Sequence, residues 1–168
     1  GVNVFAGNAD AANYGSGYEN SAILLCVKPQ RLSSVLSDLE GIIHNEQLVI
    51  SIVAGATIEY LAEELGTAKV VRAMPNTPSQ IGAGITAWTC TDEVDETERT
   101  HVRELLTALG KELFVETENM IDMATSLSAT GPTYIFMVME ALTDAGVHLG
   151  FSRNMAKELV QETMLGSV

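Results

Sequence analysis

Short apolar runs alternate with amphipathic stretches through the first two thirds of the chain. The apolar runs cover residues 1–5, 21–27, 48–54 and 69–75, and stretches with helical spacing at 30–43 and 57–66 separate them. Such alternation predicts βαβ units and therefore a parallel sheet. Apolar strands without polar interruptions, such as residues 22–27, are typical of a sheet covered by helices on both faces.

The pattern changes near residue 117. Before this point a further strand at 85–90, an amphipathic helix at 95–110 and a strand at 111–116 continue the alternation. From Glu118 onward the pattern is helical, with helices expected at 118–127, 131–150 and 152–165. The middle helix has few polar positions, which predicts that it is buried against several neighbours.

Composition and charge favour a soluble globular enzyme. Apolar residues make up 46% of the 168-residue chain and charged residues 18%, without the run of about 18 apolar residues typical of a membrane span. Nine basic against 22 acidic residues give a net charge of −13, which repels nucleic acid and anionic membranes. No signal peptide is visible, and because the chain begins without Met we expect a processed product or a fragment.

The cysteines and histidines suggest no metal or redox chemistry. Cys26 and Cys90 lie in strand-like apolar runs without a CxxC motif, so we expect buried thiols in a reducing compartment, the cytoplasm or an organelle. His44, His101 and His148 are well separated and lack metal-ligand spacing. We therefore expect three surface histidines and no metal site.

Three predicted strands end in residues suited to a ligand site. Lys28 and Pro29 follow the first, Gly55 follows the second, and Asn76 stands between Pro75 and Pro78 after the third. Ligands of doubly wound sheets bind at the carboxyl ends of the strands, so these loops predict a nucleotide site. The Gly15-x-Gly17 segment precedes a strand rather than following one, so we interpret it as a flexible turn.

A hydroxyl-rich segment precedes the apolar helix at 131–150. Ser128 and Thr130 stand just ahead of Gly131 and Pro132; Pro suits the first turn of a helix, and Ser or Thr can cap its free N–H groups. The same helix start can also receive an anionic ligand group. Sequence alone leaves both interpretations open.

Taken in order, these motifs resemble the pyrroline-5-carboxylate reductase family. The segments are "VKPQ", "SIVAG", "VRAMPNTP", "IDMATSLSATGPTYIF" and "ETMLGS". The resemblance implies an oxidoreductase that transfers hydride from NADPH, with NADH as an alternative, to the imine carbon of 1-pyrroline-5-carboxylate. Its product is L-proline, so the implied role is the last step of proline biosynthesis.

The resemblance also implies site residues. Asn76, Ser128 and Thr130 are expected at the catalytic cleft, and Glu118 near the substrate. Although Glu116 and Glu118 are spaced like a solvated acidic edge, only Glu118 matches the family. The implied cofactor-binding residues are Asn8, Cys26, Val27, Lys28, Pro29, Ala54 and Gly55.

Two family segments are missing from this sequence. A G-x-G-x-x-G segment would precede residue 1, and a Ser-Pro-Gly-Gly-Thr loop would follow residue 168. We therefore expect an α/β protein with an N-terminally incomplete Rossmann-type domain over 1–117. A helical dimerisation and substrate domain, C-terminally incomplete, is expected over 118–168.

The family dimerises through helices, so we expect a homodimer, with larger assemblies of dimers left open. Two other functions also stay open at this stage. One is a non-catalytic paralogue that acts as a dimerising interaction module. The other is a nicotinamide-dependent reductase for a different imine or oxo acid.

Overall fold

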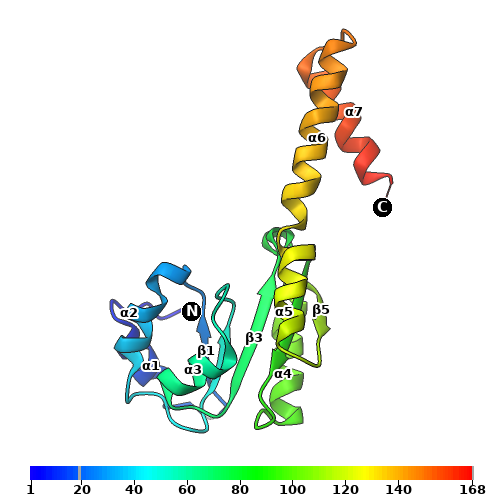
Figure 1. Cartoon of the computed structure of the whole chain (residues 1–168). Coiled ribbons are helices and arrows are strands. Elements are labelled where there is room, and N and C mark those ends of the chain that lie inside the picture. The colour runs from blue at the N-terminus through cyan, green and yellow to red at the C-terminus, as the bar shows by residue number, and fades with distance from the viewer. Residues whose placement is uncertain (19, 168) are drawn as a thin grey trace. The chain divides into compact units, whose positions relative to one another are not determined.

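The computed structural model describes residues 1–18 and 20–167, in two compact units (Figure 1). The first unit comprises Gly1–Ala129 and the second begins at Thr130. The change to helical sequence at residue 118 therefore lies inside the first unit, on the segment that leads to the second.

The first unit contains a five-stranded sheet in chain order. Its strands are β1 (Ala22–Leu25), β2 (Leu48–Ser51), β3 (Val70–Pro75), β4 (Gly84–Cys90) and β5 (Gly110–Phe114). All neighbours are parallel except β3 and β4, which are antiparallel. Only the 3₁₀ turn η1 (Thr77–Ile81) and three further residues connect that pair, too few for the crossover that parallel pairing requires.

Helices cover both faces of the sheet, as the apolar strands predict. On one face α1 (Asn8–Gly15), α2 (Pro29–Leu39) and α3 (Ile58–Leu65) pack around Val49 and Val70. On the other, α4 (Glu96–Thr107) packs against Ile50, Val71 and Trp88. Because successive strand residues point to opposite faces, adjacent valines of β3 join different cores. The Rossmann-type arrangement is confirmed.

The chain leaves the sheet through α5 (Asn119–Ala124) and a π-helical turn, η2 (Thr125–Ala129). Ile121 of α5 is buried with Ala87 and Val115 in a third apolar cluster. This contact anchors α5 to the sheet.

The second unit is a helical hairpin of α6 (Gly131–His148) and α7 (Arg153–Leu165) (Figure 1). A Cβ atom on Gly146 would lie 2.8 Å from that of buried Ala156, so the glycine permits close helix approach. Arg153 and Asp144 add an ion pair of 2.8 Å. The expected burial of α6 is wrong for this chain, in which Thr143 is the one buried residue of the helix, because α7 covers only one side.

Two further expectations are wrong. Residues 1–5 form no strand, and Val2 and Val4 are 92% and 89% exposed; no described strand pairs with them, and strand propensity depends on such pairing. Cys26 is exposed and Cys90 only partly buried, since Cys26 follows the last residue of β1 and Cys90 is the last residue of β4. The predicted turn after α1 is observed at 16–18, while Glu19 lies outside the described residues.

Candidate functional site

The three predicted ligand loops follow neighbouring parallel strands. Leu25 of β1 pairs with Ser51 of β2, and Ser51 pairs with Arg72 of β3. The residues beyond these positions therefore emerge at one edge of the sheet. Cys26–Pro29, Ala54–Gly55 and the Asn76 loop thus share an edge, the position at which doubly wound folds bind ligands.

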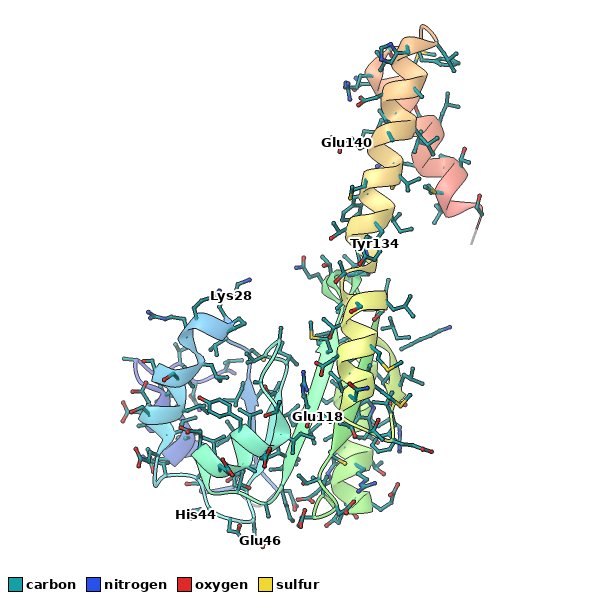
Figure 2. All side chains as sticks on the ribbon, viewed as in Figure 1. Lys28, His44, Glu46, Glu118, Tyr134 and Glu140 are labelled. Carbon is teal, nitrogen blue, oxygen red and sulfur yellow. The ribbon has the colours of Figure 1, made fainter. Side chains whose placement is uncertain are left out.

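Lys28 lies at the amino end of α2 and is exposed (Figure 2). Its backbone is extended, with φ −67° and ψ 145°, and Pro29 begins the helix. Neither the Lys28 side chain nor Pro29, which lacks an N–H, caps the helix. The ammonium group and the helix dipole therefore combine into a positive region suited to a phosphate.

Gly55 allows a sharp loop at the end of β2. Its φ is +77°, in the left-handed region, and a Cβ atom added there would meet no atom within 4 Å. Glycine adopts such a φ without the steric penalty of other residues. The loop therefore borders open space into which a flat ring can approach the backbone.

Asn76 is held firmly at the end of β3. Its side-chain Oδ1 accepts a hydrogen bond of 2.9 Å from the backbone N–H of Ile85 in β4. This bond ties the loop to the next strand. It also fixes the direction of the Nδ2 group, which is a donor.

An ion-pair network lies beneath this edge. The guanidinium of Arg72, a residue that is 3% exposed, donates to Glu118 Oε1 and to Asp122 Oδ1, each at 2.7 Å. Glu118 Oε1 also accepts from the backbone N–H of Ile58, at 2.8 Å. Figure 2 shows Glu118 between α3 and α5. Sequence reasoning missed Arg72, although a cation within the apolar strand "KVVRAMP" is the signal that could have found it.

The remaining predicted residues lie farther along the chain. Asn8 begins α1 and donates to Asp38 of α2 at 2.9 Å. Ser128 lies in the π-helical turn, and Thr130 stands immediately before α6. Of the two interpretations left open for this helix start, capping by Thr130 is not observed: Thr130 has helical φ and ψ and no side-chain cap, whereas a capping residue typically has extended backbone.

Two hollows of the first unit lie apart from Gly55 and Asn76. One, of about 260 Å³, runs along β1 between α1 and α2 and is lined in part by Asn8 and Val27. The larger, of about 540 Å³, lies at the amino ends of the strands and is lined by Lys69, Glu98 and His101 among others. The alignment of strand ends, rather than the size of a hollow, therefore identifies the candidate site.

The titratable groups suggest no separate reactive centre. Burial raises the pKa of the Cys90 thiol, and partial desolvation raises that of Cys26 although the residue as a whole is exposed. The three histidines are exposed, as expected. Among residues 1–18 and 20–167 no cluster of His, Cys, Asp or Glu could hold a metal ion. In the same part of the chain, no helix combines the length and apolar character needed to span a bilayer.

Sequence comparison identifies relatives along the whole chain. Residues 118–168 match the family described as "Pyrroline-5-carboxylate reductase dimerisation". A pyrroline-5-carboxylate reductase of Haemophilus influenzae is 35% identical over 97% of this chain and 62% of its own length. A pyrroline-5-carboxylate reductase of Synechocystis is 37% identical over 99% of this chain and 60% of its own length. The chain thus spans about three fifths of the relatives that it matches.

Solved structures agree with this assignment. A pyrroline-5-carboxylate reductase from Coxiella burnetii superimposes with a TM-score of 0.87 at 34% identity, over 98% of this chain and 60% of that one. A Plasmodium falciparum pyrroline carboxylate reductase with NADP bound superimposes with a TM-score of 0.86 at 33% identity, over 99% of this chain and 61% of that one. By fold, motif order and sequence, the chain is similar to pyrroline-5-carboxylate reductases over nearly its whole length, and its residues 118–168 match the dimerisation domain of that family.

Proposed function

We propose that the complete protein containing this chain reduces 1-pyrroline-5-carboxylate to L-proline with a reduced nicotinamide cofactor, the last step of proline biosynthesis. The observation that carries this proposal is the shared edge formed by Lys28, Gly55 and Asn76 after β1, β2 and β3. The names of the relatives supply the reaction.

The residues at this edge fit a dinucleotide. The open space above Gly55 accommodates a ring, and the positive region at Lys28 suits a phosphate. We place Cys26, Val27, Lys28, Pro29, Ala54 and Gly55 around the cofactor, with Asn8 at its ribose. The relative with NADP bound supports NADPH as the cofactor.

The reaction requires orientation more than acid–base groups. When bound, a reduced nicotinamide would supply the hydride that adds to the imine carbon, and the nitrogen would use the former C=N π electron pair to take a proton from solvent. The chain's contribution is to hold the reacting atoms within near-attack distance. We assign the Asn76 amide to this positioning.

Two hydroxyls and one carboxylate complete the proposed site. Ser128 and Thr130 stand where the chain passes from the π-helical turn into α6, and we propose that they donate hydrogen bonds to the substrate. Glu118 stays our proposed acidic residue near the substrate. Its Oε1 already accepts from Arg72 and Ile58, so we expect it to act by shaping the cleft.

We propose that the protein is a homodimer, assembled through α6 and α7. Tyr134, Ile135, Phe136, Met137 and Val138 of α6 are each about half exposed or more, and such a run of exposed apolar side chains is typical of a protein–protein interaction site. The matched dimerisation family covers these residues. The two free cysteines suit a reducing compartment such as the cytoplasm.

A comparison of substrates tests the function. The complete protein is supplied with NADPH and either pyrroline-5-carboxylate or a series of 2-oxo acids, and nicotinamide oxidation is followed by absorbance. We expect turnover with pyrroline-5-carboxylate alone. Turnover only with oxo acids would identify a different reductase on this scaffold, and no turnover despite dimer formation would indicate a non-catalytic interaction module.

A further inference from the structure

We propose that Arg72 is a positioning residue for the nucleotide, acting through Glu118 on the loop at Gly55. This inference rests on the proposed function for its ligand. Arg72 lies on β3, buried, on the face where α3 and α5 pack. It does not reach the edge of the sheet itself, so any effect on a ligand must pass through its partners.

The guanidinium has two partners at the start of α5. Glu118 immediately precedes α5 and Asp122 lies in its first turn, four residues later, so both carboxylates face the same side. Arg72 Nη1 binds Glu118 and Nη2 binds Asp122, both at 2.7 Å. A planar guanidinium serves two such acceptors at once, which an ammonium cannot do with the same geometry.

The network has two arms, the Arg72–Glu118 ion pair and the Arg72–Asp122 ion pair. The two carboxylates differ in their further hydrogen-bond partners. Glu118 Oε1 also accepts from the N–H of Ile58, the first residue of α3. The Asp122 side chain has no second partner among the hydrogen bonds of the described residues. Only the Glu118 arm therefore connects Arg72 to α3.

The start of α3 determines the position of the Gly55 loop. Only Ala56 and Thr57 separate Gly55 from Ile58, and Thr57 caps α3 by accepting from the N–H of Tyr60. A displaced Ile58 would therefore move the backbone at Gly55. Arg72 thus holds Glu118, Glu118 holds Ile58, and Ile58 fixes the loop that we place at the nicotinamide.

Matched removal of the two arms tests this chain of contacts. Glu118→Ala and Asp122→Ala each delete one 2.7 Å ion pair with the same cation, so both should lower the melting temperature of the complete protein. The affinity for NADPH, measured by equilibrium titration without substrate, should differ between the two variants. We expect Glu118→Ala to weaken NADPH binding about tenfold and Asp122→Ala to leave it within about twofold.

Two further variants strengthen the comparison. Glu118→Gln keeps an acceptor for the Ile58 N–H, so it should restore most of the affinity lost in Glu118→Ala. Arg72→Met removes the shared cation and should weaken NADPH binding as Glu118→Ala does. Combining Arg72→Met with Glu118→Ala should then add little further loss, because both act along one path.

Equal affinity changes in the Glu118→Ala and Asp122→Ala variants, or none in either, would overturn the inference and indicate a stability role alone. A wild-type protein that binds NADPH but does not reduce pyrroline-5-carboxylate would overturn the proposed function instead. The affinity comparison would still decide the role of Arg72.

Discussion

The Asn76 side chain accepts a 2.9 Å hydrogen bond from the backbone N–H of Ile85 and so fastens the end of β3 to the start of β4. The amide is thereby fixed through its oxygen, and its nitrogen is left as the group that can meet a ligand. The structural role, which is to join the loop to β4, and the proposed ligand role thus belong to different atoms of one side chain. Variants can separate them.

Asn76→Asp keeps an oxygen for the Ile85 N–H but removes the donor. We expect its melting temperature to stay near that of the wild type, while single-turnover hydride transfer slows about tenfold to a hundredfold. Asn76→Ala should slow transfer similarly and also lose about 1 kcal/mol of stability, because a hydrogen bond is lost. Wild-type transfer by a well-folded Asn76→Asp variant would remove Asn76 from the proposed site.

Gly55→Ala should impair nucleotide binding beyond its effect on stability. Its φ of +77° costs a non-glycine residue roughly 1–2 kcal/mol, and the new methyl group would enter the open space that we assign to the nicotinamide. Gly41→Ala is the matched control, because Gly41 has φ +71° and equally open surroundings. We expect similar losses in chemical denaturation but weaker NADPH binding for Gly55→Ala alone; equal affinities would contradict the placement.

Cys26 should react slowly with iodoacetamide at neutral pH. Desolvation raises the pKa of its thiol, so less of the reactive thiolate is present than in a free cysteine. The alkylation rate should therefore increase as the pH rises toward the elevated pKa. Saturating NADPH should protect Cys26, which we place at the cofactor, and leave the rate at Cys90 unchanged. Mass spectrometry of the two peptides measures both, and an unprotected Cys26 would argue against its contact with the nucleotide.

Phe136→Glu should dissociate the dimer. Phe136 is 62% exposed on α6 within the apolar surface that we assign to the partner subunit, and a buried unpaired carboxylate is costly. Leu113→Glu is the control, since Leu113 is 53% exposed on β5 in the other compact unit. Sedimentation at micromolar concentration should show monomers for the first variant and dimers for the second. Dimers in both would place the interface elsewhere.

Local signals were sufficient to locate the five observed strands, β1 to β5, and the loops at the edge of the sheet. Pro29 and Pro75 mark strand ends because proline has a fixed φ and no N–H group, and Gly55 marks one because it adopts a left-handed φ. Parallel neighbours then end at one edge of the sheet. The antiparallel direction of β4 follows from the short connection between β3 and β4, and the hydrophobic periodicity of the strands gives no information about direction. Arg72 was missed because its partner Glu118 is 46 residues away and no local pattern joins them.

Burial of α6 could not be inferred correctly from one chain. Apolar periodicity indicates that Phe136 and its neighbours require a partner surface, but it does not distinguish a surface of the same chain from that of another. Residues 1–5 illustrate the same limit, because a β-rich run forms a strand only where another strand can pair with it.

The central claim concerns hydride transfer to pyrroline-5-carboxylate, and isotope transfer tests it most directly. The complete protein is incubated with pyrroline-5-carboxylate and NADPH that carries deuterium at the transferring C4 position, and the product is examined by mass spectrometry. We predict L-proline with one deuterium on the former imine carbon, together with unlabelled oxidised cofactor. Unlabelled proline, or no proline from a folded protein that binds NADPH, would contradict the account.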